Sequence, residues 1–340
     1  MMSVDPERLP STQIPSSTSI ARPAGRPAKA ARTPIVRRAV HGVLLLDKPL
    51  GLSSNDALQK VKRLFRAEKA GHTGTLDPLA TGLLPLCFGA ATKFSQISLD
   101  ADKRYTATLT LGITTMTADA EGEILERQEV NVTPAQFETA CRGFIGEIDQ
   151  MPPMHSALKH EGRALYDYAR AGIEVKREPR RVAIRDIAVM GGSHDVWTID
   201  VRCSKGTYIR TLAEDIGRAL GCGAHVSALR RTASGPLGLE GAFTIEQLMQ
   251  MSEAERDAAL READALLADW PSVRLDAENA GRFLSGVRRR IPLADAPHVR
   301  VYGPDACAFL GSGHIIGGEL ISNRLLSPVE VEGLLQKEST

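Results

Sequence analysis

The stretch GHTGTLDPLATGLLP, residues 71–85, organises the rest of the chain. It places glycines, threonines, one histidine and one aspartate before a short apolar run. Asp77 precedes a proline, which biases its predecessor toward extended geometry and is tolerated in the first turn of a helix. We therefore predict a glycine-rich loop that ends at Asp77, followed by a short helix over residues 78–86.

Two interpretations of Asp77 stay open on this local pattern. The first is a helix N-cap, whose carboxylate accepts hydrogen bonds from free backbone N–H groups. The second is a catalytic group. Gly71 and Gly74 lie on either side of His72, which indicates unusual torsions or the close approach of a ligand. A carboxylate held rigidly at a cleft is a candidate nucleophile or base.

The composition excludes several classes of protein. The chain has 340 residues, 43% of them hydrophobic, and no apolar run approaches the ~18 residues of a membrane span. Its five cysteines are scattered, without metal-ligand or disulfide-framework spacing. We expect a cytoplasmic protein with two domains and a tail, without a membrane span and without a metal. No coiled-coil heptads occur, so we expect a monomer.

The positive charge is concentrated at the N-terminus. Residues 1–39 are rich in Pro, Ser, Ala and Arg and carry +5, which leaves −4 for the remainder. Six prolines, Asp5 and Glu7 argue against an amphipathic targeting helix, so we predict a disordered basic tail. The nearly neutral body can bind RNA only if its basic residues lie together on one face.

Alternating hydrophobicity and capping residues predict a mixture of strands and helices. Expected strands are 43–46, 104–112, 182–189, 196–203 and 223–232, the third and fourth paired across Gly191 and Gly192. Expected helices are 55–66, capped by Ser53 and Asp56; 134–144; 163–172; and 208–220, capped by Thr207. Residues 243–268 read as helical. From about residue 271, short β-like pieces at 299–302, 306–310 and 315–321 indicate a small separate β domain.

Arg210 is predicted in the first turn of the helix over 208–220, where the helix dipole disfavours a cation by up to ~1 kcal/mol. A compensating anion is therefore expected. Asp77 or a phosphate would supply it, and so would Glu214 at i+4; the pattern favours none of these.

The sequence contains no CxxC, HExxH or GK[ST] ending of a phosphate loop, and we expect no cofactor. It also offers no second acid to partner Asp77, although most glycosidases use two. A lone carboxylate could break a glycosidic bond without losing the base to water.

The motif GHTGTLDPLATG closely resembles the catalytic motif of bacterial tRNA pseudouridine-55 synthases. The likeness runs over residues 42–232 and includes GVLLLDKPLGLSSNDALQKVKR, DKRY, SALKHEGRALYDYARAG and CSKGTYIRTLAEDIG. It implies an α+β fold: a mixed, largely antiparallel sheet with flanking helices in a catalytic domain (residues 40–270), and a small C-terminal β-rich, PUA-like RNA-binding domain (residues 271–335).

The resemblance also implies roles for particular residues. Asp77 is the catalytic group, and Arg210 pairs with it, keeping the carboxylate ionised and oriented. Tyr105 is the third residue of the implied catalytic set, with Asp77 and Arg210: it stacks on the base and is suited to remove the C5 proton. The implied substrate-binding residues are Tyr208 and Leu229, which line the pocket; His72, which fills the gap left by the flipped base; and Lys48, near the pocket. One departure is His155, where relatives often have tyrosine.

The implied activity is isomerisation of uridine 55 in the T-loop of tRNA to pseudouridine. The glycosidic bond breaks, the base turns, and a C–C bond forms. The implied partner is the T-arm of tRNA. Two alternatives stay open: a non-catalytic RNA-binding or tRNA-folding factor on the same scaffold, and an unrelated glycosidase or hydrolase, which the missing second acid disfavours.

Overall fold

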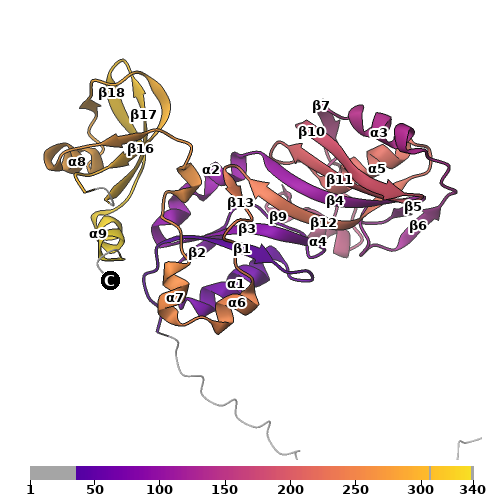
Figure 1. Ribbon diagram of the computed structural model, residues 1–340, viewed down its shortest axis with the longest axis horizontal. Helices are drawn as coiled ribbons and strands as arrows, with labels where there is room; N and C mark the ends of the chain where they lie inside the picture. The colour runs from indigo at the N-terminus through magenta and orange to yellow at the C-terminus, as the bar shows by residue number, and fades with distance from the viewer. Residues whose placement is uncertain (1–35, 306–307, 338–340) are drawn as a thin grey trace, which may run out of the picture. The chain divides into compact units, whose positions relative to one another are not determined.

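The computed structural model describes residues 36–305 and 308–337. Its larger sheet is mixed, with the order β1-β3-β12-β4-β11-β10-β7; β2 adds to β3, and β13 adds to β12 (Figure 1). Only the β3–β12 pair is parallel among the pairings of this sheet in the described residues. Its strands are β1 (Gly42–Lys48), β2 (Ala70–His72), β3 (Ala80–Phe88), β4 (Lys103–Leu111), β7 (Gly146–Gln150), β10 (Arg180–Ser193), β11 (Val196–Cys203), β12 (Ala224–Ser234) and β13 (Leu237–Gly238).

Helices flank this sheet, and their starts follow from their sequence. The Ser53 side chain accepts from the Asp56 N–H at 3.1 Å, as predicted, and Thr133 and Gln136 form a reciprocal capping box. The predicted α+β fold with a largely antiparallel sheet is therefore confirmed. The helices here are α1 (Ser54–Leu64), η1 (Gly89–Phe94), α2 (Ser95–Asp100), α3 (Pro134–Arg142), α4 (Leu165–Arg170), α5 (Ile209–Ala219), α6 (Ile245–Gln250), α7 (Glu253–Ala258) and η2 (Ala265–Leu267).

The helix predicted over residues 78–86 is wrong, because this segment is the strand β3. The strand pairs with β1 on one side and with β12 on the other, and eight of its nine residues are buried. A strand buried on both faces loses its alternation, so periodicity cannot separate it from a buried helix. Gly82 and Pro85, inside the run, were the signal against a helix.

Two smaller predictions also need correction. The strands 182–189 and 196–203 do pair, but β10 continues through the two glycines to Ser193, and the turn lies at residues 194–195. The segment 243–268 is not one helix. It is divided into α6, α7 and η2, because Met251 has extended geometry and Ser252 begins a new capping box. Two short hairpins complete this part: β5 (Ile113–Thr115) with β6 (Ile124–Arg127), and β8 (Lys159–His160) with β9 (Arg163–Ala164).

The C-terminal part is a five-stranded sheet with the order β14-β16-β17-β18-β15, which confirms the expected β-rich region. The predicted strand over 315–321 is in fact a hairpin that turns at Gly317 and Gly318, both with positive φ. Its elements are β14 (Ser272–Arg274), α8 (Ala277–Leu284), β15 (Arg289–Arg290), β16 (Ala296–Tyr302), β17 (Phe309–Ile316), β18 (Glu319–Leu325) and α9 (Pro328–Lys337).

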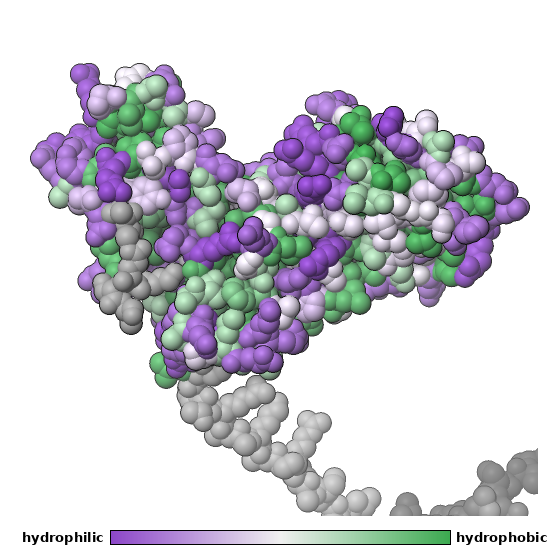
Figure 2. Space-filling model, in the orientation of Figure 1, coloured by the Kyte–Doolittle hydropathy of each residue, from purple (hydrophilic) through white to green (hydrophobic). Residues whose placement is uncertain are grey.

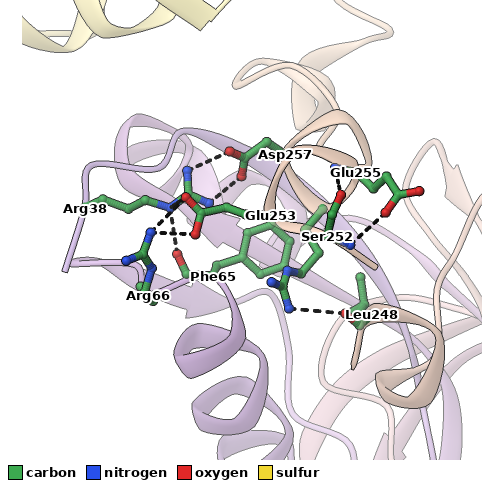
Figure 3. Close-up of polar contacts among 9 residues, drawn as sticks. Arg38, Phe65, Arg66, Leu248, Ser252, Glu253, Glu255 and Asp257 are labelled. Carbon is green, nitrogen blue, oxygen red and sulfur yellow. Dashed lines mark hydrogen bonds and ion pairs between the residues drawn. The ribbon is translucent and has the colours of Figure 1, made fainter. Parts of the chain in front are cut away.

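Residues 1–35 of the predicted disordered tail lie outside the described residues. The predicted end of the tail at residue 39 is wrong, because Arg38, within the described stretch 36–39, is anchored to distant parts of the chain. Its guanidinium binds both carboxylate oxygens of Asp257 at 2.5 and 2.6 Å, and its Nε donates to the Phe65 carbonyl at 3.1 Å (Figure 3). Arg66 binds Glu253 beside it. Helix α7 is thereby tied to the segment that leads into β1.

Two truncated proteins are therefore expected to differ in melting temperature. Removing residues 1–35 should leave the melting temperature unchanged, as the predicted tail requires. Removing residues 1–39 takes away Arg38 with its bidentate ion pair, so the melting temperature should fall by several degrees, at about 2–4 °C per kcal/mol for a protein of this size. Thermal unfolding of the two truncated proteins measures this, and a large fall on removing residues 1–35 alone would contradict the tail.

In the part of the chain that the structure describes, no helix is long and apolar enough to cross a bilayer. On the face drawn in Figure 2, hydrophobic and hydrophilic residues are interspersed.

Candidate active site

The loop that carries Asp77 runs between β2 and β3 and is held by buried side chains. Ser54 Oγ accepts from the Leu76 N–H at 2.7 Å and donates to the Leu76 carbonyl at 3.0 Å. Arg231, on β12, is 1% exposed; it donates to the carbonyls of Gly74 and of a β3 residue. Gly74 has φ +92°, a conformation that favours glycine, as predicted. Gly71, for which the same was predicted, does not.

Asp77 and Arg210 form an ion pair, as predicted. Arg210 Nη2 lies 3.0 Å from Asp77 Oδ2; the Arg210 side chain is 5% exposed and the Asp77 side chain 39%. The alternative that Asp77 caps a following helix is wrong, because a strand follows. The carboxylate is therefore held from its inner side by a buried cation, while part of it stays open to an incoming molecule.

Arg210 itself is held by three further acceptors. Its Nη1 donates to the Thr117 carbonyl at 3.0 Å and lies 3.3 Å from Asp119 Oδ2, and its Nη2 donates to the His155 carbonyl at 2.7 Å. These acceptors compensate the unfavourable position of a cation in the first turn of α5. His155 contributes its backbone here, so this contact does not depend on having tyrosine at that position.

The alternative partner Glu214 is not among the ion-pair partners of Arg210 in the described residues. Nor does Thr207 cap α5, because its hydroxyl donates back to the Ser204 carbonyl. The N-cap residue is Tyr208, whose backbone N–H is instead bound by the Gln150 side chain at 3.0 Å.

Asp119 is a second carboxylate on Arg210 that the sequence did not suggest. Its side chain is 4% exposed and accepts from the Thr117 hydroxyl at 2.5 Å and from the Glu121 N–H at 3.1 Å, besides Arg210. With its oxygens bound, Asp119 is suited to fixing Arg210 rather than to donating a proton.

Two cavities meet at Asp77. The first, about 240 Å³, is lined by Tyr105, Tyr208 and Leu229 among others, and we name it the inner cavity. The second, about 550 Å³, is lined by His72 and others, and we name it the outer cavity. Both linings share six residues, which we call the throat: Thr75, Leu76, Asp77, Ser156, Ala157 and Arg210. A pocket that combines aromatic and apolar side chains with polar ones, and has a carboxylate at its edge, fits a flat heterocyclic ring attached to a chain outside.

Three strands and a helix position the wall of the inner cavity. Tyr105 on β4 lies opposite Arg231 on β12, and Leu229, two residues earlier, lies between β4 and β3. Tyr208 stands at the start of α5, two residues before Arg210. The fold thus gathers four of the predicted residues, with Asp77, around one cavity.

The other two predicted residues lie elsewhere. His72 ends β2 and lines the outer cavity, where its Nδ1 is buried without a hydrogen-bond partner in the described chain. Lys48 is fully buried, and its amino group donates to the carbonyls of Pro49 and Leu52 at 2.9 and 2.6 Å. Lys48 therefore holds the turn after β1, and a contact with substrate stays a prediction for it.

Burial and the neighbouring charges shift the pKa of Asp77 in opposite directions. Burial raises the pKa of the Asp77 carboxyl above its usual value, Arg210 lowers it, and Asp119 raises it again. Burial likewise raises the pKa of the Tyr105 phenol, so this ring is held neutral. Burial, with Arg231 nearby, lowers the pKa of His72, which favours an uncharged imidazole.

These shifts predict a pH dependence. If the reaction needs Asp77 ionised, kcat/KM falls as pH decreases through the pKa of Asp77, and this fall occurs at a higher pH than for an ordinary aspartate. The pH profile of kcat/KM for the free enzyme measures it. If kcat/KM falls only at or below the usual pKa of an aspartate, the raised pKa of Asp77 is contradicted.

Comparison with known proteins identifies the family of this chain. Three family profiles match in succession: "TruB family pseudouridylate synthase (N terminal domain)" over residues 62–209, "tRNA pseudouridylate synthase B C-terminal domain" over 210–268, and "Pseudouridine synthase II TruB, C-terminal" over 271–326. The chain is 57% identical to a tRNA pseudouridine synthase B of Verminephrobacter eiseniae, over 91% of this chain and 96% of that protein. A tRNA pseudouridine synthase B of Ralstonia nicotianae is also 57% identical, over 88% of this chain and 98% of that protein.

Solved structures agree on the fold. The crystal structure of an archaeal box H/ACA sRNP Nop10-Cbf5 complex matches with a TM-score of 0.65 at 23% identity, over 88% of this chain and 90% of that one. The fold is thus that of the pseudouridine synthase class of enzymes. The chain belongs to the TruB family of pseudouridylate synthases.

Proposed function

We propose that the protein isomerises a uridine in the T-loop of tRNA, at position 55, to pseudouridine, with Asp77 as its catalytic residue. The observation that carries this proposal is the Asp77–Arg210 pair at the throat between the two cavities. The relatives' name supplies the substrate class, since they are called tRNA pseudouridine synthases.

The reaction conserves the atoms of the nucleotide. The N1–C1′ bond breaks, the uracil turns within the inner cavity, the C5–C1′ bond forms, and the C5 proton leaves as N1 gains one. Asp77 faces the throat, where the ribose of an everted nucleotide would lie, and can attack or deprotonate there. The inner cavity keeps the detached base beside C1′.

The resemblance gives the other residues roles that their positions support. Tyr105, whose phenol is held neutral, offers a stacking face, with Leu229 and Tyr208 completing the wall. The uncharged imidazole of His72 lies in the outer cavity, suited to stack where the base has left the RNA loop. RNA loops are favoured targets because their bases can be splayed out.

The proposal is tested with a tRNA transcript and a T-arm stem–loop, each labelled in uridine. Incubation with the protein should convert the uridine at position 55 and leave the other uridines unchanged. A transcript with cytidine at position 55 is the control and should yield no pseudouridine. Conversion at another position would overturn the T-loop assignment, and no conversion would favour the non-catalytic RNA-binding alternative.

A further inference from the structure

Ser156 carries a buried hydroxyl group with no hydrogen-bond partner in the part of the chain that the structure describes. The residue is 3% exposed, and its backbone carbonyl already accepts from the Tyr166 N–H at 3.1 Å. Burying a hydroxyl without a partner is unfavourable, and nearly all such groups in folded proteins are paired. The missing partner of the Ser156 hydroxyl is therefore expected to come from a ligand, which must displace the groups that cover this oxygen.

The position of Ser156 restricts which part of the substrate that ligand can be. Ser156 is one of the six throat residues and lines both cavities, as Asp77 does. With the base in the inner cavity and the RNA strand in the outer one, the ribose of the target nucleotide passes through the throat.

The charge of the throat argues against a phosphate as partner. Asp77 presents a carboxylate there, and the guanidinium of Arg210 is already bound to Asp77, Asp119 and two backbone carbonyls. A phosphate would meet the carboxylate without a free cation from Arg210 to offset it. A neutral hydroxyl can both donate to and accept from a serine.

We propose that Ser156 Oγ hydrogen-bonds the 2′-hydroxyl of the target nucleotide. Within an RNA strand the 3′ and 5′ oxygens are esterified, so the 2′-hydroxyl is the one free hydroxyl of that ribose. Ser156 then distinguishes ribose from deoxyribose at the reacting position, because the 2′-hydroxyl is what separates RNA from DNA. This assignment rests on the proposed function.

The test is a cycle that pairs Ser156→Ala with removal of the 2′-hydroxyl. T-arm stem–loops with uridine or 2′-deoxyuridine at position 55 are bound to protein on an Asp77→Asn background, so that no turnover occurs. Ser156→Ala should weaken binding of the uridine RNA about 3- to 10-fold, the usual range for one hydrogen bond, and leave binding of the deoxyuridine RNA unchanged.

Equal weakening of both RNAs, or of neither, would overturn the ribose assignment, provided that the protein with Asp77 intact converts uridine 55. If that protein forms no pseudouridine, the proposed function fails, and this assignment with it.

Ser54→Ala is the matched control for a structural role. Ser54 is also a buried serine beside the site, but its hydroxyl is bonded to both backbone groups of Leu76. Ser54→Ala should lower the melting temperature of the free protein, whereas Ser156→Ala should leave it unchanged or raise it. A fall for Ser156→Ala like that of Ser54→Ala would overturn the proposal, because the hydroxyl would then have a structural partner.

Discussion

Asp77→Asn is expected to abolish pseudouridine formation, by more than about 10³-fold, and to leave affinity for tRNA within a few-fold of the unchanged protein. The amide keeps the shape of the side chain but can neither attack carbon nor take up a proton at neutral pH. Affinity survives because most of it comes from contacts to phosphates. Product formation and equilibrium binding, measured on one tRNA transcript, separate the two effects.

The same substitution should not destabilise the protein. Since burial raises the pKa of Asp77 in the fold, its contribution to stability is fully present only below the unfolded pKa and is lost as pH rises through the folded pKa. At neutral pH the ionised carboxylate is therefore a cost, which a neutral amide removes. The melting temperature of Asp77→Asn should be equal or higher at pH 7.

A matched control is Asp200→Asn. Asp200 forms an ion pair with Arg104 at 2.6 Å on the same sheet, and neither residue lines the two cavities. It should keep full activity. Retained activity in Asp77→Asn would overturn the assignment of Asp77, and a lost affinity for tRNA would mean that this carboxylate serves binding instead.

Arg210→Ala is expected to lower both turnover and stability. Turnover should fall by on the order of 10²-fold or more, because Asp77 loses its orientation and part of its ionisation, while tRNA affinity changes little. The free energy of unfolding should fall by about 3–5 kcal/mol, because Asp119 is left buried without its cation. Single-turnover kinetics and denaturant unfolding measure the two losses.

Neutralising Asp119 separates the loss of turnover from the loss of stability in Arg210→Ala. In the double variant Arg210→Ala with Asp119→Asn, no buried charge is left alone, so much of the stability should return while turnover stays low. If both losses were recovered together, the slow turnover of Arg210→Ala would reflect misfolding. Equal loss of turnover and tRNA affinity in Arg210→Ala would indicate that Arg210 binds phosphate.

Elements with one exposed face could be predicted from the sequence, because their pattern alternates or caps visibly. Strand β4 alternates buried and exposed side chains, and α1 begins at the capping pair of Ser53 and Asp56. Strand β3 could not be predicted from the sequence, because burial on both faces removes the alternation of apolar and polar residues. The resemblance to pseudouridine-55 synthases indicated the Asp77–Arg210 pair, which the structure confirms.

The remaining site residues depend on contacts between distant segments. Asp119 sits in a loop between two short strands, and only the tertiary fold brings it 3.3 Å from Arg210. Arg231 follows Arg230 directly, yet one is buried under the Asp77 loop and the other pairs with Asp47 at the edge. Nothing local in the sequence distinguishes such neighbours, because their burial is decided by the strand that they face.

The parallel pairing of β3 with β12 joins segments about 150 residues apart in the chain and places Leu229 beside Ala80. Closing so long a loop costs conformational entropy, and we expect this pairing to form after the local contacts of each segment. A nascent polypeptide still on the ribosome therefore presents the Asp77 loop before its opposite wall has been synthesised. The protein acquires its pocket only after β12 has emerged, so an incomplete chain cannot hold a uridine in place for reaction.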